Sequence, residues 1–222
     1  MSITAVIFDM DGVLSDSAEA HLESWRLLAG ELGREVTEQQ FSASFGRQNR
    51  DIVPLLFGDG LTEERIRELS GRKEVLYRES VRGRVRAIEG AVELVRGCRE
   101  AGLKLAVGSS APRENVELVL EGLGIGACFE VIVHDGDVSR GKPDPEVFAI
   151  AAERLGVAPA CCVVIEDAPS GVAAALAAGM TVIGLTTHHR RDRLAGAHLV
   201  TDSLQLLTAG QLAGMQVGHW IS

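Results

Sequence analysis

The feature that most limits the fold of this chain is a regular alternation of helical segments and short apolar runs from residue 89 onward. The apolar runs are 103–107, 130–133, 162–165 and 181–185, with a last short pair after residue 198. The helical segments between them are 89–101, 112–123, 144–156 and 170–178. Such alternation predicts a doubly wound parallel sheet covered by helices on both faces. We therefore predict an α/β fold, whose sheet also takes in the apolar run 3–8.

Helical periodicity fills the interval between the first apolar run and residue 89. The helices expected there are 18–32, 38–45, 51–57 and 62–81. This helical segment interrupts the sheet domain, so we predict a core of residues 1–15 and 86–222 with an insert of residues 16–85. The tail 210–222 is spaced with glycines and weakly patterned, and it predicts little.

The charge balance of the chain excludes one class of partner. The 222 residues carry a formal net charge of −9, which argues against a nucleic-acid binder with a broadly basic surface. Ten of the 22 Lys and Arg residues lie between Arg47 and Arg86, against seven acidic residues. Exposed helix faces explain this cluster most simply, and steering of an anionic substrate is the alternative.

The cysteines and the apolar segments bear on location. Cys98, Cys128, Cys161 and Cys162 lack the spacing of a metal site, which favours reduced, buried thiols. The chain shows neither a cleavable apolar leader nor an unbroken apolar span of membrane length. We expect a cytoplasmic protein without a membrane partner, as a monomer or a weak homodimer.

Two carboxylates follow the first apolar run. Asp9 and Asp11 are one residue apart, and Gly12 allows the chain to turn so that both side chains can reach one reacting centre. Ligands of open α/β sheets bind at the carboxyl edge of the strands. A metal and a phosphate are therefore expected beside Asp9, Asp11 and Gly12, although a solvated acidic turn would have the same sequence.

Two further strand ends carry groups that suit a phosphate. The run 103–107 leads to Ser109 and Ser110, whose hydroxyl and backbone N–H groups can hold phosphate oxygens. The run 130–133 leads to Lys142, a point charge for a phosphate and for a carboxylate. Taken alone, a serine such as Ser109 is more often a helix cap before Pro112, and a lysine such as Lys142 is more often a surface lysine.

The run 162–165 ends in Glu166 and Asp167. Their hard oxygen ligands, together with Asp9, suit Mg²⁺, which keeps several waters and takes few protein carboxylates. A simple turn at the strand end is the alternative for this pair. All four strand ends fall on one edge of the predicted sheet, which favours a shared site.

Together these motifs resemble the haloacid dehalogenase superfamily of phosphohydrolases and phosphomutases. In chain order they are Asp9-Met10-Asp11-Gly12, Ser109, Gly141-Lys142-Pro143-Asp144-Pro145 and Glu166-Asp167. The resemblance covers roughly residues 3 to 208. It implies a Rossmann-like core and makes the helical insert a cap that closes over the site and determines the substrate.

The resemblance also implies a role for each motif. Asp9 would be the nucleophile that forms an aspartyl-phosphate, and Asp11 the general acid and base. Ser109 and Lys142 would clamp the phosphoryl group. Members that hydrolyse carbon–halogen bonds or phosphonates generally lack an acid at the position of Asp11, so phosphate esters are favoured.

The same resemblance implies a bound Mg²⁺. Asp9, the main-chain carbonyl of Asp11 and Asp167 would hold the ion, with Glu166 beside them. A small phosphorylated metabolite is the expected substrate.

The insert resembles the β-phosphoglucomutase branch at two positions, His21 and Lys73, though a packed hinge histidine and a solvated lysine are equally open. The mutase's arginine for a second phosphate aligns with Asn49 here, and Arg47 and Arg50 flank it. A mutase must hold a second phosphate while the sugar reorients, and a phosphatase need not.

Three hypotheses follow. The first is a Mg²⁺-dependent phosphatase for a small phosphorylated metabolite, most simply a sugar phosphate. The second is a β-phosphoglucomutase that interconverts β-glucose 1-phosphate and glucose 6-phosphate. The third is a catalytically idle binding module, which the intact motifs disfavour. His188 to Arg191 are expected to form a solvated loop, because they lack metal spacing.

Overall fold

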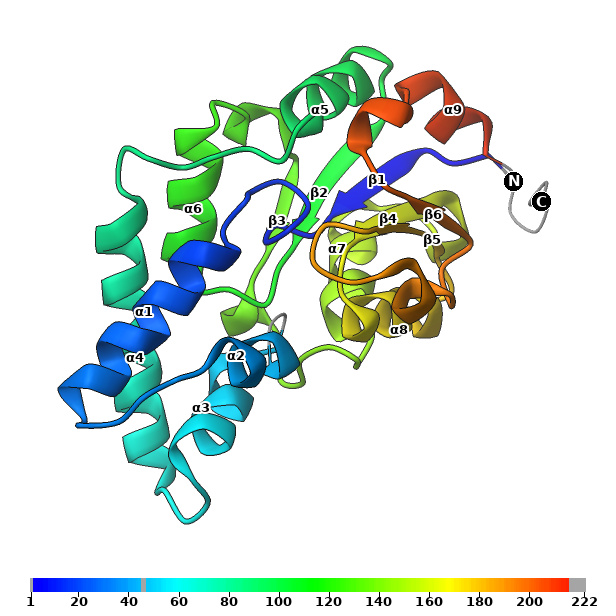
Figure 1. Ribbon diagram of the computed structural model, residues 1–222. Helices are drawn as coiled ribbons and strands as arrows, with labels where there is room; N and C mark the ends of the chain where they lie inside the picture. The colour runs from blue at the N-terminus through cyan, green and yellow to red at the C-terminus, as the bar shows by residue number, and fades with distance from the viewer. Residues whose placement is uncertain (1, 45–46, 216–222) are drawn as a thin grey trace.

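The computed structural model describes residues 2–44 and 47–215. Within these ranges one sheet of parallel strands has the order β3-β2-β1-β4-β5-β6 (Figure 1). The strands are β1 (Ala5–Phe8), β2 (Lys104–Gly108), β3 (Val131–Val133), β4 (Cys162–Glu166), β5 (Thr181–Leu185) and β6 (Leu199–Thr201). The predicted doubly wound α/β fold is confirmed.

Helices α1 to α8 of the described ranges begin and end close to their predicted limits, whereas no limits were predicted for α9. They are α1 (Ala18–Glu31), α2 (Glu38–Ser44), α3 (Asn49–Phe57), α4 (Glu63–Val81), α5 (Ala91–Glu100), α6 (Arg113–Gly122), α7 (Glu146–Leu155), α8 (Pro169–Ala177) and α9 (Ala209–Gly214). The predicted end of the second helix at Phe45 and the tail from residue 216 lie outside the described residues. Thr62 caps α4, since its side chain accepts a hydrogen bond from the Arg65 N–H.

Helices cover both faces of the sheet, and the period-2 alternation of the strands divides their side chains between two buried clusters. Val6 and Phe8 of β1 pack in the cluster that α5, α6 and α9 complete. Ala5 and Ile7 point to the opposite face and pack against α7 and α8. Figure 1 shows these two helical layers on either side of the strands.

Helices α1 to α4 form the helical insert and have a hydrophobic cluster of their own. Its buried residues are Trp25, Leu28, Ala29, Val36, Phe41, Ile52, Val53, Leu56, Phe57, Leu69 and Leu76. The contact between α1 and α4 is the most extensive one in this part of the molecule. The insert therefore stabilises itself by burying apolar surface separately from the sheet.

Two backbone segments side by side join the insert to the sheet. Ser15 and Ala87 form an isolated antiparallel bridge. The Asp16 N–H donates to the Arg86 carbonyl at 2.9 Å, and the Ile88 N–H donates to the Leu14 carbonyl at 3.0 Å. We call these two paired segments, residues 14–16 and 86–88, the stem. The stem lies directly after the turn that carries Asp9 and Asp11, so it holds the insert over the carboxyl edge of the sheet.

The strand order determines where a ligand can bind. From β1 the chain passes to β2 and β3 on one side, whereas β4, β5 and β6 lie on the other. The adjacent carboxyl ends of β1 and β4 therefore flank the switch point, where open α/β sheets have their binding crevice.

No helix in the described ranges is long and apolar enough to cross a membrane. All four cysteines are free. Cys98 and Cys162 are buried and the other two are partly buried, which agrees with the expected reduced thiols.

A core substitution in β2 tests the packing. We expect Leu105→Ala to lower the free energy of unfolding by about 2–5 kcal/mol, because it removes buried methyl groups and leaves a cavity. Leu206→Ala is the matched control, since Leu206 is 66% exposed and Leu105 is 0% exposed. Urea denaturation followed by circular dichroism measures both, and equal losses would contradict the assigned core.

Candidate active site

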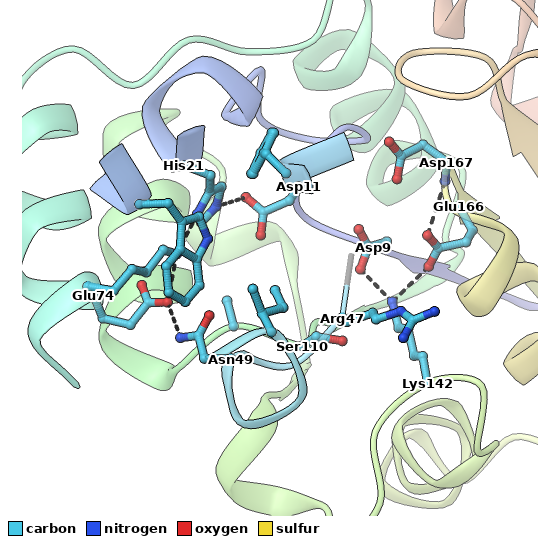
Figure 2. A pocket seen from close by; sticks show the side chains of 15 residues that line it. Asp9, Asp11, His21, Arg47, Asn49, Glu74, Ser110, Lys142, Glu166 and Asp167 are labelled. Atoms are coloured by element: carbon cyan, nitrogen blue, oxygen red, sulfur yellow. Dashed lines mark hydrogen bonds and ion pairs between the residues drawn. The ribbon is translucent and has the colours of Figure 1, made fainter. Parts of the chain in front are cut away.

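A small cavity lies between the carboxyl edge of the sheet and the helical insert (Figure 2). Its volume is about 50 Å³. The sheet domain contributes Asp9, Asp11, Ser110, Ala111, Lys142, Glu166 and Asp167 to its wall, and the insert contributes His21, Trp25, Phe41, Arg47, Asn49, Ile52, Lys73 and Glu74. Side chains from both parts of the chain therefore line one shared space.

Lys142 joins the ends of two central strands. Its Nζ donates to Asp9 Oδ1 at 2.6 Å and to Glu166 Oε2 at 2.7 Å. The ammonium also lies 4.7 Å from the centroid of the Phe148 ring of α7. Burial alone would lower the pKa of Lys142, but the two carboxylates outweigh it and raise that pKa above its ordinary value.

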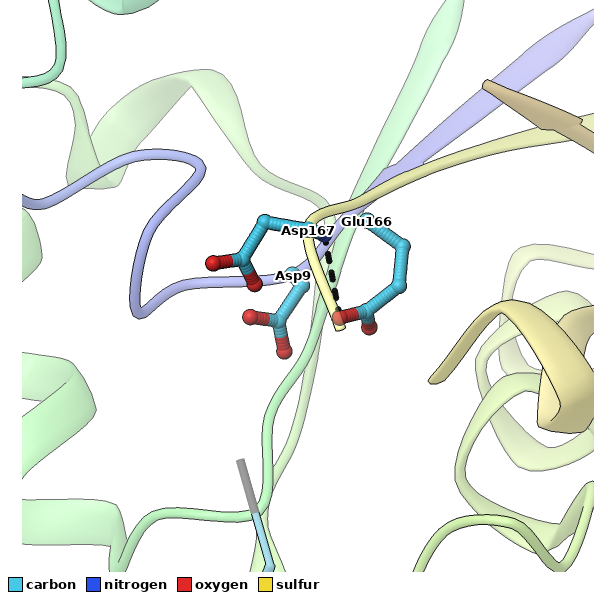
Figure 3. Close-up of side chains that lie close together, drawn as sticks. All are labelled: Asp9, Glu166 and Asp167. Carbon is cyan, nitrogen blue, oxygen red and sulfur yellow. Dashed lines mark hydrogen bonds between the residues drawn. The ribbon is translucent and has the colours of Figure 1, made fainter. Parts of the chain in front are cut away.

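Asp9, Glu166 and Asp167 form a buried acidic cluster (Figure 3). One oxygen from each carboxylate lies within 4.8 Å of the others. Burial, together with the charge of Glu166, raises the pKa of Asp9 to about 7. Burial also raises the pKa of Asp167 to about 6. Because one lysine cannot balance three carboxylates, this set of hard oxygens fits a divalent cation such as Mg²⁺.

Asp11 lies in the same cavity but has different neighbours. Its Oδ1 accepts hydrogen bonds from Ser17 Oγ at 2.5 Å and from His21 Nε2 at 3.1 Å. Burial works to raise the pKa of Asp11, and the contacts with His21 and Ser17 outweigh it and lower that pKa below its usual value. Asp11 is therefore a carboxylate at neutral pH in the ligand-free protein.

Lys73, on the insert, is linked to Asp11 by way of the His21 imidazole. Lys73 Nζ lies 2.7 Å from His21 Nδ1. An ammonium can only donate, so Nδ1 accepts from it and Nε2 carries the proton that is donated to Asp11. The His21 ring also stacks on Tyr77, with centroids 4.0 Å apart and planes at 9°. These contacts keep the imidazole in one orientation beside Asp11.

Glu74 is a buried carboxylate on the insert side of the cavity. It accepts hydrogen bonds from Lys73 Nζ at 2.8 Å and from the side-chain amides of Asn49 and Asn115. Burial alone would raise the pKa of Glu74, but Lys73, His21 and Asn49 outweigh it and lower that pKa. Asn115 belongs to α6 of the core, and it also accepts a hydrogen bond from Arg78 at 2.9 Å. This contact ties the insert to the sheet domain.

The remaining predicted site residues lie in different places. Arg47 and Ser110 line the cavity. Ser109 is buried, and its Oγ accepts a hydrogen bond from the Ala111 N–H at 3.0 Å. Gly12 has a φ of +84° in the turn beside Asp167. Arg50 does not line this cavity, and its guanidinium donates to the Ser139 carbonyl at 3.0 Å, so its contact with substrate stays a prediction.

The prediction that residues 188–191, after β5, form a solvated loop is wrong for His188. His188 Nδ1 lies 2.8 Å from Asp167 Oδ2, and the His188 side chain is only 20% exposed. Arg190, two residues later, is exposed as predicted. Glu74 is a second site residue that the sequence reasoning missed, since a charged residue in a long helix carries no signal of a buried partner.

The site thus combines a buried carboxylate, Asp9, with a buried lysine, Lys142. Two further acids, Glu166 and Asp167, complete a set of oxygens that fits a metal ion. Such a combination suits the binding of an anionic group. The family model of the haloacid dehalogenase-like hydrolases matches residues 3–179 of this chain. The chain belongs to this family.

Known relatives cover nearly the whole chain. A phosphorylated carbohydrates phosphatase of Thermotoga maritima is 34% identical over 94% of this chain and 92% of its own length. The β-phosphoglucomutase of Bacillus subtilis is 32% identical over 92% of this chain and 91% of its own length. Among solved structures, a β-phosphoglucomutase from Clostridium difficile aligns with a TM-score of 0.85 at 28% identity, covering 95% of each chain.

The acidic cluster predicts an unusual pH dependence of stability without divalent ions. The pKa of Asp9 is about 7 and that of Asp167 about 6 in the folded protein, so the fold keeps protons that the unfolded chain has released. The free energy of unfolding therefore falls as pH rises from about 4 to about 7. In EDTA we expect a lower melting temperature at pH 8 than at pH 5.5, by scanning calorimetry.

Two comparisons make this prediction specific. Asp9→Asn removes one of the carboxyl groups whose pKa is raised, so its melting temperature should depend less on pH. MgCl₂ should raise the melting temperature of the unaltered protein more at pH 8 than at pH 5.5, because the ion binds deprotonated carboxylates. No effect of MgCl₂ at pH 8 would contradict the interpretation of the cluster as a cation site.

Proposed function

We propose that this protein is a Mg²⁺-dependent phosphatase that hydrolyses a small phosphorylated metabolite, most simply a sugar monophosphate, through an aspartyl-phosphate. The observation that carries the proposal is the pairing of Asp9 with Lys142 at 2.6 Å inside a cavity that Asp11 also lines. A carboxylate, a fixed cation and a second carboxylate then face one space. These three groups can serve as the nucleophile, as the stabiliser of negative charge and as the donor or acceptor of a proton, respectively.

The first half-reaction begins at Asp9. Its carboxylate oxygen attacks phosphorus, the bond from phosphorus to the ester oxygen breaks, and the aspartyl-phosphate forms. Lys142 and the backbone around Ser109 and Ser110 would hold the phosphoryl oxygens and stabilise the charge that spreads over them. A Mg²⁺ held by Asp9, Asp167 and the Asp11 main-chain carbonyl, with Glu166 beside it, would offset the repulsion between the nucleophile and an anionic ester.

Asp11 would move the protons. As an acid it donates a proton to the leaving ester oxygen, and as a base it takes a proton from the water that attacks the aspartyl-phosphate. The free protein holds Asp11 as a carboxylate through His21 and Ser17. A doubly charged phosphate beside it raises its pKa, so binding of the substrate is the step at which Asp11 acquires its proton.

The far end of the cavity favours a monophosphate over a bisphosphate. In Figure 2, Glu74 and Asn49 lie on the side of the cavity away from Lys142, and Arg47 lies toward Lys142. The Asn49 amide donates its N–H to Glu74, so its carbonyl oxygen remains to accept. The Glu74 carboxylate and the Asn49 oxygen can accept hydrogen bonds from sugar hydroxyl groups. The Glu74 carboxylate also neutralises the Lys73 ammonium, so little positive charge remains there to bind a second phosphate.

The size of the cavity implies that binding is coupled to movement of the insert. About 50 Å³ accommodates only a few water molecules, whereas a sugar phosphate is several times larger. The stem at Ser15 and Ala87 is the point about which the insert can open. Closure over the substrate then excludes water from the first half-reaction.

The relatives agree with this substrate class, since one is named as a phosphatase of phosphorylated carbohydrates. β-Phosphoglucomutase activity is the second candidate, and the contact of Lys73 with His21 beside Asp11 favours it. Glu74 opposes it, because its carboxylate neutralises the neighbouring Lys73 ammonium, which a second phosphate would otherwise use as its counter-charge. In keeping with the free cysteines, we place the enzyme in the cytoplasm, as a monomer or weak homodimer.

Phosphate release from a panel of sugar monophosphates tests the proposal directly. We expect turnover with MgCl₂, and a loss of at least about 10³-fold in kcat for Asp9→Asn, which removes the nucleophile. A parallel assay follows β-glucose 1-phosphate with added bisphosphate. Isomerisation without net phosphate release would favour the mutase, and no reaction of any kind would favour an idle binding module.

A substitution at the far end tests the preference for monophosphates. We expect fructose 1-phosphate or 6-phosphate to have a higher kcat/KM than fructose 1,6-bisphosphate. Glu74→Gln should narrow that ratio by about tenfold, because it removes one negative charge facing the second phosphate. Glu64→Gln, in the exposed first turn of the same helix, is the control. An unchanged ratio in Glu74→Gln would show that Glu74 does not select the substrate.

A further inference from the structure

The segment after β5 bridges the sheet edge and the two turns that carry the acidic cluster. The Thr186 N–H donates to the Thr201 carbonyl of β6 at 3.0 Å, which anchors the segment on one side. On the other side, Thr187 Oγ1 donates to the Gly12 carbonyl at 2.7 Å. The segment therefore reaches from the edge strand to the turn that follows Asp9.

His188 contacts the acidic cluster itself. Its Nδ1 lies 2.8 Å from Asp167 Oδ2, and the Asp167 side chain is 2% exposed. A carboxylate is acceptor-only, so Nδ1 must carry the hydrogen. Burial alone would lower the pKa of His188, but the hydrogen bond and the charge of Asp167 outweigh it and raise that pKa. His188 therefore holds Oδ2 of Asp167 by a hydrogen bond, and this contact fixes the orientation of a carboxylate that belongs to the cluster.

Gly12 provides the space for this contact. A Cβ at position 12 would lie 2.1 Å from Asp167 Oδ2 and 2.7 Å from His188 Nδ1. Both distances are far below van der Waals contact, so an ordinary side chain would break the hydrogen bond apart. The turn after Asp9 can therefore lie against Asp167 and His188 only because residue 12 is a glycine.

We propose that His188 is a positioning residue that orients the Asp167 carboxylate for a divalent cation, with Thr187 fixing the adjoining turn. The proposal rests on the cation role proposed for the acidic cluster. Hydrogen bonds from outer groups orient ligating carboxylates, and their loss typically weakens metal binding by about 10–100-fold. His188 is not itself among the side chains that form the cluster within the described residues.

Titration calorimetry with Mg²⁺ in the absence of substrate, at pH 7.5, tests the proposal. We expect His188→Ala to raise the Kd for Mg²⁺ by about 10–100-fold. His188→Asn retains an N–H donor near the position of Nδ1 and should recover part of that loss. His189→Ala is the matched control, since His189 is the neighbouring imidazole, is also half-buried and lies outside the cluster. Its Kd should equal that of the unaltered protein.

Activity gives a second, independent readout. At saturating MgCl₂ the kcat of the His188→Ala variant should be within a few-fold of that of the unaltered protein. At low MgCl₂ the turnover rate of the variant should be much lower than that of the unaltered protein. Circular dichroism melting in EDTA checks that the variants are folded.

The outcomes separate the two proposals. If the unaltered protein binds Mg²⁺ and His188→Ala binds it within about twofold as tightly, the positioning role is refuted and the proposed function stands. If the unaltered protein binds no Mg²⁺, the cation role of the cluster fails and the positioning role fails with it.

Discussion

The structure depends on three carboxylates buried around a single ammonium. Asp9, Glu166 and Asp167 converge at the carboxyl ends of β1 and β4, and Lys142 contacts two of them. Buried charge of one sign is costly, and it raises the pKa of Asp9 to about 7 and that of Asp167 to about 6, so the ligand-free protein relieves the charge by binding protons only below these pH values. A divalent cation relieves the same excess while leaving Asp9 ionised, which is the form that attacks phosphorus.

The surrounding contacts divide the carboxylates by task. Asp9 and Asp11 are one residue apart, yet the first faces Lys142 and Glu166, whereas the second faces His21 and Ser17. Burial and like charge raise the pKa of Asp9, and hydrogen bonds lower that of Asp11. Separation of neighbouring pKa values by environment is the usual way in which two acids acquire different roles.

Sequence reasoning identified the sheet, the insert and the acids at the strand ends, because each has a local signal: periodicity for the elements, and strand-end position for Asp9 and Asp167. It did not distinguish Arg47, which lines the cavity, from Arg50, which does not, because both simply flank Asn49 in the sequence. It missed Glu74 and His188, whose partners lie 41 and 21 residues away along the chain. Contacts of that kind depend on how the insert and the loop after β5 pack, which no local pattern encodes.

In the proposed mechanism, Asp9 receives the phosphoryl group. The most direct test is an acid quench of the enzyme during turnover of a sugar monophosphate with radiolabelled phosphate, followed by proteolysis and peptide mapping. If Asp9 is the nucleophile, an acid-stable, hydroxylamine-labile label should appear on the peptide that contains Asp9 and be absent in Asp9→Asn. Label on a peptide containing Ser109 and Ser110 instead, with Asp9→Asn still turning over, would contradict it.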